Sequence, residues 1–498
     1  MKHLKKIVSL LLTAVMVLAM CIPVMAADVA TAATTYTITA PATKHIYEIY
    51  QIFTGELNDG VLSNVKWGAN GTGTKGEAVN DTTLKALTDV NAETDAKKLE
   101  VITTYANLES TPVGTVTDGS SYSAAAGYYL IKDKDGSVTN KDVYTTYIVE
   151  VVGDVTISPK SDVPKFEKKI KDRNDSTDAA NTYTGWQDSA DYDIGDQVPF
   201  KLEGTVTSKY NDYKTYYFAF HDKEEAGLTF NEGSVKVYVD GNVITTGYQV
   251  VTSPTDGCTF EVVFNNLKNV ASVKAGSKVT VEYTSELNEN AVLGNQGNVN
   301  EAKLEFSNNP NQEQNGTPET GETPWDNVIV FTYKVVVDKY ANSENGNKLT
   351  GAEFTLEKVL KNGSKETIKV VKSEDGTSFT FKGLDDGDYI LTETKTPDKY
   401  NTIAPIHFTV NAEHNIEWNS GARTDILTSL TGTTPTGEIT FTANEDKSGL
   451  ETKVVNKSGS TLPETGGIGT TIFYVVGVIL MLGAGVLLVT KKRMSSNR

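Results

Sequence analysis

Short runs of alternating apolar and polar residues dominate the middle of this chain, and Gly, Asn and Asp separate them. The runs are rich in Thr, Val and Tyr, whereas amphipathic-helix patterns are scarce. Successive side chains of a β-strand point to opposite faces, so each run predicts a strand with one buried face. The sequence therefore predicts an all-β protein built from sandwiches, and its length suits about three domains.

Two breaks interrupt these runs. The sequence SPKSDVPK carries two prolines at Ser158–Lys165, and residues 307–327 form a polar stretch rich in Pro and Gly. Such stretches are typical of boundaries and linkers. We therefore expect domains at 27–160, 161–315 and 325–458, with a linker at 316–324 and a terminal segment at 459–498. A small helical insertion is expected in the first domain, around NDTTLKALTDVNAETDAKKLEVITTYA.

Both ends of the chain carry apolar segments. Residues 1–26 have a basic start, an apolar middle and the residues Val24 and Ala26 near the end, which is typical of a secretory signal peptide. Residues 468–490 are apolar and are followed by the basic sequence KKR. A membrane helix needs roughly 20 apolar residues, and a basic flank stays in the cytoplasm. The domains are therefore predicted to lie outside the cell.

Composition excludes several classes of function. The net charge of −18 argues against nucleic-acid binding. Without the signal peptide, Cys258 is the only cysteine, so it forms no internal disulfide; a buried apolar role is favoured over a catalytic one. The five histidines show no metal-ligand spacing, and no nucleophile–His–acid set is apparent. We therefore expect a protein that binds no cofactor or metal and is not a turnover enzyme.

Alternation also directs polar groups toward the predicted interior of the second domain. In KFEKKIKD, Lys168 is in phase with Phe166 and Ile170, which are core residues. In TYYFAFHD, Asp222 is in phase with three aromatic residues, and in NVNEAKLEF, Asn300 is in phase with apolar ones. An amine, a carboxyl and a carboxamide are therefore each predicted inside one sandwich.

The third domain repeats this order. Lys339 in YKVVVDK, Glu393 in DYILTE and Asn456 in TKVVN are each in phase with apolar residues. Burying an unpaired lysine or carboxylate costs several kcal/mol. A buried ion pair or a chance register would explain one such set, but two sets in the same order favour a chemical role.

That role follows from the residue types. Desolvation lowers the pKa of a lysine and raises that of an acid. A neutral amine is a nucleophile, and a protonated acid can donate to the asparagine carbonyl and shuttle protons. Attack on the carboxamide would release ammonia and leave an isopeptide bond between the first and last strands of each domain. Folding would supply the proximity, Asp222 and Glu393 would be the proton shuttles, and each bond would form in a single turnover.

Several sequences together resemble the backbone pilins of Gram-positive sortase-assembled pili, over essentially the whole chain. LPETG matches the LPxTG sorting signal, KLTGAEFTLEK with GDYILTETKTPDKY resembles a collagen-adhesin B-type domain, and YDIGDQVPFKL, FAFHD and NVNEAKLEF resemble the fimbrial isopeptide-forming second domain. The resemblance implies tandem immunoglobulin-like sandwiches of the collagen-adhesin A and B types. It also implies the bonds Lys168–Asn300 and Lys339–Asn456; Asn308 is an alternative to Asn300 that the strand phase does not favour.

The resemblance further implies how subunits are joined. The sorting motif consists of Leu462, Pro463, Glu464, Thr465 and Gly466. A sortase cysteine would cleave after Thr465 and hold it as a thioester, which a lysine of the next subunit resolves. The family's acceptor lies in a YPK motif; here VTISPKSD offers Lys160, with Ser158 in place of the tyrosine. Lys165 is the nearest alternative.

The expected protein is thus a secreted structural pilus subunit that is covalently anchored to the cell wall. The expected partners are a pilin-type sortase, a housekeeping sortase, other copies of the chain and peptidoglycan; accessory pilins and host-surface ligands are further candidates. The alternative is a monomeric LPxTG wall-anchored adhesin, which shares the sorting signal and both domain types. Adhesins usually add a binding region or many stalk repeats, and the sequence favours the pilin.

Overall fold

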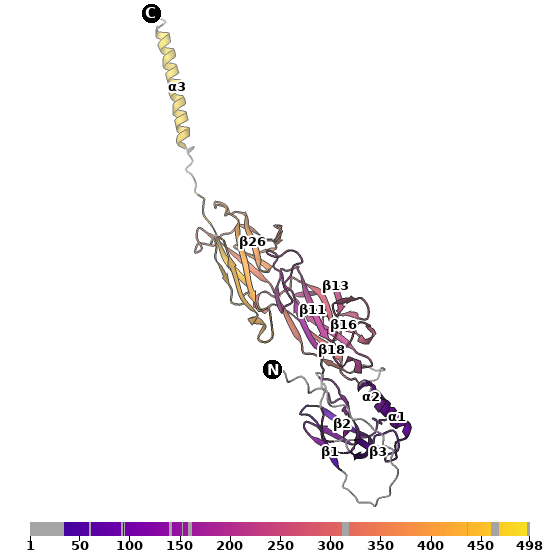
Figure 1. Cartoon of the computed structure of the whole chain (residues 1–498). Helices are drawn as coiled ribbons and strands as arrows, with labels where there is room; N and C mark the ends of the chain where they lie inside the picture. Colours follow the sequence, from indigo (N-terminus) through magenta and orange to yellow (C-terminus); the bar gives the residue numbers. More distant parts are fainter. Residues whose placement is uncertain are drawn as a thin grey trace, which may run out of the picture.

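The structure is a computed structural model, and it describes residues 34–58, 61–90, 93, 95–138, 142–151, 153–157, 162–310, 318–435, 437–459 and 468–495. Three β-sandwiches follow one another along an elongated molecule, and a long helix extends from the C-terminal end (Figure 1). The prediction of an all-β chain of tandem sandwiches is confirmed. The predicted signal peptide, Lys160 and the sorting motif lie outside the described residues.

The first sandwich consists of a three-stranded and a five-stranded sheet. The strands are β1 (Thr35–Thr39), β5 (Ser121–Ala125) and β8 (Val155–Thr156) in one sheet, and β2 (Ile46–Asn58), β3 (Val61–Trp67), β4 (Gly114–Thr117), β6 (Gly127–Asp133) and β7 (Thr146–Val151) in the other. The helical insertion is confirmed, but as two short helices, α1 (Asp81–Asp89) and α2 (Asp95–Thr103). Asn80 caps α1, because its side chain accepts a hydrogen bond from the backbone nitrogen of Thr83.

The second sandwich packs two larger sheets around one core. The first sheet contains β9 (Lys165–Ile170), β11 (Gln197–Thr205), β13 (Leu228–Val239), β14 (Asn242–Ile244) and β17 (Lys278–Leu287). The second contains β10 (Ser189–Asp191), β12 (Phe218–Glu224), β15 (Gln249–Thr252), β16 (Phe260–Phe264), β18 (Asn298–Ser307), β19 (Thr320–Glu322) and β20 (Asp326–Phe331). Strand β9 forms the edge of the first sheet, and β12 and β18 are paired in the second.

One strand, β19, lies within the region 316–324, where the sequence predicts a linker. Strand β19 pairs with β18, and β20, which the sequence assigns to the third domain, also pairs with β18. Because alternate residues of a strand face opposite sides, β20 serves two cores: Val328 and Val330 pack in the second, Ile329 and Phe331 in the third. The polar composition gave no sign of the short strand β19. The second and third sandwiches share strand β20 at their junction.

The third sandwich consists of two five-stranded sheets. One contains β21 (Tyr333–Ala341), β24 (Val370–Lys372), β25 (Ser378–Leu384), β29 (Phe441–Ala443) and β30 (Gly449–Asn456); the other contains β22 (Glu353–Val359), β23 (Lys365–Ile368), β26 (Gly387–Lys395), β27 (Ile406–His414) and β28 (Leu427–Thr433). The first and last strands, β21 and β30, lie side by side and parallel.

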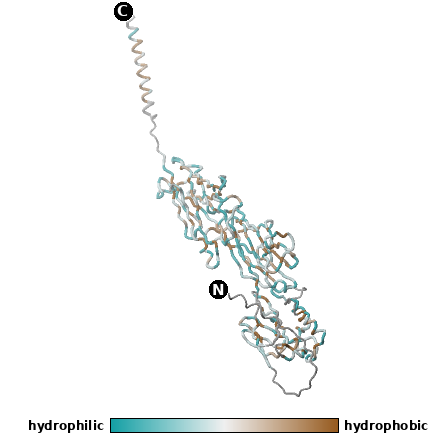
Figure 2. Tube along the Cα trace, viewed as in Figure 1, coloured by the Kyte–Doolittle hydropathy of each residue, from teal (hydrophilic) through white to brown (hydrophobic). Residues whose placement is uncertain are grey.

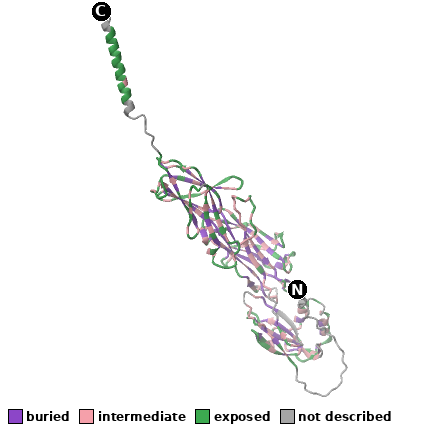
Figure 3. Ribbon diagram, turned by 60° about the vertical axis from the view of Figure 1, so that its left-hand side comes forward, coloured by how far each residue is buried: buried purple, intermediate pink, exposed green. Residues whose placement is uncertain are grey.

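The helix α3 (Ile468–Ser495) stands apart from the sandwiches. Its segment Ile472–Lys492 has a mean hydropathy of 2.7 and is long and apolar enough to cross a membrane. Hydrophobic colouring runs along α3 in Figure 2, and Figure 3 shows this helix exposed while buried residues line the interiors of the sandwiches. A helix that is apolar and exposed all round suits a lipid environment, which agrees with the predicted membrane segment.

Candidate functional site

The second sandwich brings together the three residues that alternation directed inward. Lys168 extends from β9 of one sheet, and Asp222 and Asn300 extend from β12 and β18 of the facing sheet. All three are fully buried, with 0% exposure. The Lys168 Nζ lies 2.5 Å from Asp222 Oδ2. We call these residues the second-sandwich triad.

Two further residues complete this cluster, and the sequence analysis missed both. The Tyr283 hydroxyl accepts from Lys168 Nζ at 2.8 Å and from Asn300 Nδ2 at 2.9 Å, and it donates to Asp222 Oδ2 at 2.6 Å. Asn300 Nδ2 also donates to Glu224 Oε1 at 3.3 Å. The same period of two would have found them, since Glu224 continues the phase of Asp222 along β12, and Tyr283 is in phase with the valines of β17.

Burial sets the electrostatics of this cluster. Burial lowers the pKa of the Lys168 amine and outweighs the opposing charge of Asp222. Burial also raises the pKa of the Asp222 carboxyl, and it raises that of Glu224 to about 8, with the Asp222 charge adding to the effect. The Phe200 ring, with its centroid 5.2 Å from Lys168 Nζ, is part of the apolar wall. The surroundings therefore favour the neutral forms of the Lys168 amine and of one of the two acids, Asp222 or Glu224.

The third sandwich holds a second cluster, the third-sandwich triad of Lys339, Glu393 and Asn456. Lys339 on β21 and Asn456 on β30 belong to one sheet, and Glu393 on β26 faces them from the other. Glu393 Oε1 lies 3.0 Å from Lys339 Nζ, and Glu393 Oε2 accepts from Asn456 Nδ2 at 3.0 Å. Burial lowers the pKa of Lys339. One carboxylate thus bridges the amine and the amide.

The two triads differ in the strands that they connect. In the third sandwich the lysine and asparagine lie on the first and last strands, as the sequence predicted. In the second they lie on opposite sheets, and β18 is followed by β19 and β20, so the expectation of a last strand is wrong there. In both, the carbonyl oxygen of the asparagine is buried without a hydrogen-bond partner among the described residues. Such orphaned groups are costly and often mark reactive positions.

The alternative residues lie elsewhere. Asn308 contacts the first sandwich: its Nδ2 donates to the backbone carbonyl of Asp142, and its backbone carbonyl accepts from the backbone nitrogen of Tyr144. Lys165 is exposed at the start of β9. In the first sandwich, no lysine is buried among the residues whose burial the structure describes. Cys258 is buried beside Asp256, and burial raises the pKa of its thiol to about 12, which agrees with the expected inert role.

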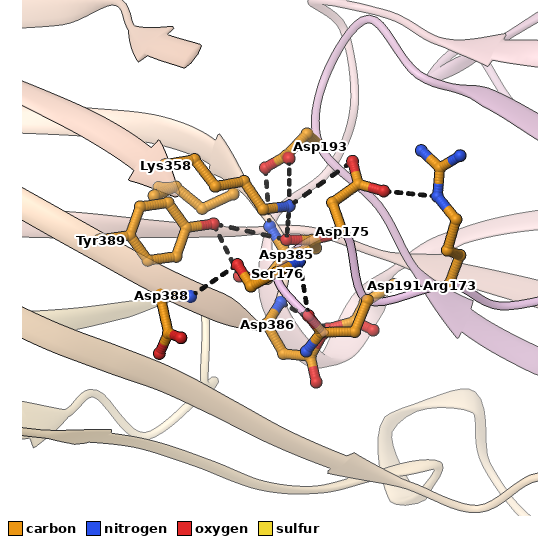
Figure 4. A network of polar contacts seen from close by, with 12 residues as sticks. Arg173, Asp175, Ser176, Asp191, Asp193, Lys358, Asp385, Asp386, Asp388 and Tyr389 are labelled. Carbon is orange, nitrogen blue, oxygen red and sulfur yellow. Dashed lines mark hydrogen bonds and ion pairs between the residues drawn. The ribbon is translucent and has the colours of Figure 1, made fainter. Parts of the chain in front are cut away.

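A third buried lysine lies at the junction of the second and third sandwiches (Figure 4). Lys358 of β22 is fully buried and forms ion pairs with Asp385 of its own sandwich and with Asp193 of the second, the latter at 2.5 Å. Burial alone would lower the pKa of this amine, but the charges of Asp385 and Asp193 raise it by more, so the net shift is upward. Lys358 is therefore a charged structural group, unlike Lys168 and Lys339.

Lys358→Met should destabilise this junction. The change leaves Asp193 and Asp385 buried without their cation, a loss that typically costs about 3–5 kcal/mol. Burial raises the pKa of both acids, so they take up protons more readily as the pH falls, and the loss should be larger at pH 8 than at pH 5. Thermal unfolding of the exported chain measures the effect. Lys365→Met removes an exposed ion pair with Glu357 and should change little; equal losses in both variants would contradict this role.

Family models match two parts of the chain. A prealbumin-like fold domain matches residues 333–422, which contain Lys339 and Glu393, and the LPXTG cell wall anchor motif matches residues 454–496. The anchor match and the apolar α3 together mark a cell-wall-anchored surface protein whose precursor is held transiently in the membrane.

Known proteins resemble most of the chain. The T6 backbone pilin of Streptococcus pyogenes serotype M6, which has a modular three-domain structure, covers 86% of this chain and 99% of its own with a TM-score of 0.52 and 17% identity. The trypsin-resistant surface T6 protein of the same serotype is 26% identical over 435 residues, or 76% of this chain and 77% of that protein. The chain resembles the Gram-positive backbone pilins. The full-length major pilin SpaD of Corynebacterium diphtheriae is 17% identical, with a TM-score of 0.47 over 86% of this chain and 98% of that one.

These similarities place the triads in a pilin-like scaffold. The resemblance that the sequence motifs suggested is thus confirmed, and it is a resemblance to structural proteins of the cell surface. The individual site residues and the predicted domain limits stay predictions.

Proposed function

We propose that this chain is the structural subunit of a covalently polymerised cell-surface pilus and that it crosslinks itself internally. The proposal rests on one observation: two sandwiches each enclose a lysine, an acid and an asparagine in one buried polar cluster, which Tyr283 connects in the second sandwich and Glu393 connects in the third. Burying a lysine and a carboxyl costs free energy, and the repeated placement of both beside an asparagine favours a chemical role over an ion pair alone.

The proposed reaction joins Lys168 to Asn300 and Lys339 to Asn456. The neutral lysine amine attacks the carboxamide carbon, the carbon–nitrogen bond of the carboxamide breaks, and ammonia leaves. Asp222 and Glu393 serve as proton shuttles: each accepts a proton from the lysine nitrogen, and the departing nitrogen takes up one proton. The geometry of Glu393 supports this role, because its two oxygens each lie 3.0 Å from one of the two nitrogens.

Subunits would be joined end to end by a pilin-type sortase. The enzyme would cleave after Thr465 and transfer its carbonyl to Lys160 of another copy, and a housekeeping sortase would attach the last subunit to peptidoglycan. The anchor match at residues 454–496 and the 26% identity to a surface protein support the donor half of this reaction. Accessory pilins and host-surface ligands would be further partners.

A denaturing immunoblot tests the polymer. The full chain is expressed together with a pilin-type sortase, and the wall fraction is released and boiled in detergent. A covalent pilus should give a ladder of bands above the monomer, which disappears when the sortase cysteine is replaced by alanine. A single anchored band with the active sortase would contradict polymerisation and leave the monomeric wall-anchored adhesin as the function.

A further inference from the structure

The two triads handle the departing amide nitrogen differently. In the third sandwich, Glu393 contacts both nitrogens, so a single acid can receive one proton and return another. In the second sandwich, Asp222 Oδ2 holds the Lys168 amine and the Tyr283 hydroxyl, at 2.5 and 2.6 Å. The amide nitrogen of Asn300 donates to Tyr283 and Glu224, and it also lies near enough to Asp222 to oppose the rise in the pKa of that carboxyl. The shortest contacts of Asp222 are thus with the amine and the tyrosine, and Glu224 adds a second acid beside the amide nitrogen.

We propose that Glu224 is a second catalytic acid of the second sandwich, which protonates the departing nitrogen of Asn300 while Asp222 accepts the proton of Lys168. This proposal rests on the proposed isopeptide chemistry and assigns a residue that the third sandwich does not need. Tyr283 would position both halves of the site, because its hydroxyl contacts Lys168, Asp222 and Asn300.

The protons balance without any added reagent. Before reaction Lys168 is a neutral amine, Asp222 a carboxylate and Glu224 a carboxylic acid. The amine nitrogen bonds to the Asn300 carbon and gives one proton to Asp222. The amide nitrogen, which gains a lone pair once the carbon is tetrahedral, takes one proton from Glu224 and leaves as ammonia. Afterwards Asp222 is protonated and Glu224 is ionised, so the net charge is unchanged.

The strand register supports this division. Glu224 is the direct cross-strand partner of Asn300, and Asp222 lies two residues away on the same face of β12. Two neighbouring buried carboxyls rarely ionise together, and burial holds the pKa of Glu224 at about 8, so it is protonated at neutral pH. Ser285 bonds Glu224 Oε1, whereas Oε2 is buried and has no hydrogen-bond partner in the described structure.

Glu224 also borders the route by which ammonia can leave. A cavity of about 350 Å³ lies between the second and third sandwiches, and Glu224, Arg423 and Trp418 are among its lining residues. Glu224 therefore connects the buried amide to space that water can enter, at the position where the leaving group is released.

The test uses the full chain and measures each bond separately. Wild type and Glu224→Gln are denatured and digested, and the crosslinked peptides are quantified by mass spectrometry over time after synthesis. A general acid contributes roughly 10²–10⁴-fold in rate, so Lys168–Asn300 should form at least ~100-fold more slowly in Glu224→Gln, while Lys339–Asn456 forms as in wild type. Glu203→Gln is the control, because Glu203 belongs to the same sandwich but pairs with the exposed Lys278, away from the cavity.

Glu224→Asp separates chemistry from packing. It keeps an acid but shortens the side chain, so it should form the Lys168–Asn300 bond faster than Glu224→Gln. Equal rates of bond formation in wild type and Glu224→Gln would overturn the proposed role of Glu224. Equal slowing in Glu224→Gln and Glu224→Asp would overturn it as well. Both results would leave the proposed function intact. If wild type formed neither bond, the isopeptide chemistry itself would be refuted, and this proposal with it.

Discussion

Replacing Glu393 by alanine should leave the third sandwich without its crosslink and lower its melting temperature by about 10–20 °C. Loop closure across roughly 100 residues contributes about 5 kcal/mol in the disulfide analogy, and Lys339 and Asn456 are separated by a loop of that order. About 5 kcal/mol corresponds to that shift for a domain of this size. Asp222→Ala should act in the same way on the second sandwich. Calorimetry of the exported chain would show each transition.

Two controls separate the bond from the buried charges. Glu353→Ala removes an exposed acid of the same sandwich, paired with Lys395, and should not shift the melting temperature. A double variant, Lys339→Met with Glu393→Leu, removes both buried charges and the bond together. If the bond is the source of stability, this double variant stays well below wild type. Recovery to the wild-type melting temperature would mean that the residues form only an ion pair.

Lys160→Ala should abolish the sortase-dependent ladder while leaving export, folding and both internal bonds intact. Polymerisation needs a donor carbonyl and an acceptor amine at different ends of the subunit. Thr465 follows the third sandwich, and Lys160 lies between the last strand of the first sandwich and the first strand of the second. Repeating this head-to-tail contact gives an open fibre and no closed ring.

Lys165→Ala is the matched control for the acceptor. Lys165 is exposed, lies five positions further along the chain and belongs to a paired strand, so its replacement should keep the ladder. Tandem mass spectrometry of the polymer would locate the residue that carries Thr465. Detection of Thr465 on another lysine would refute the acceptor assignment and leave the pilus intact.

Alternation along single strands predicted the triads well, because the side-chain period of a strand depends only on local geometry. It directed Lys168 and Lys339 inward, and the structure buries both completely. The same rule, carried further along the strands, would have included Glu224 and Tyr283. It would also have shown Lys358 in phase with Leu356, which lies in the core of the third sandwich.

The alternation of residues along single strands could not predict the contacts between sandwiches. The pairing of Lys358 with Asp193 joins residues 165 positions apart, and no local pattern encodes which surfaces meet. Strand β20 was misassigned for the same reason, since its two faces serve two different cores. Strand β19 was missed because a three-residue Thr-Gly-Glu strand within a Pro- and Gly-rich stretch carries no alternation.

The intact mass of the exported chain shows whether the two triads are crosslinked. Each internal bond expels one ammonia molecule, so the denatured wild-type protein should be lighter than its sequence by two ammonia molecules. Asp222→Ala and Glu393→Ala should each restore one of them, and the double variant should match its sequence mass. A wild-type mass equal to that of the sequence would contradict the account and reduce both triads to buried polar clusters.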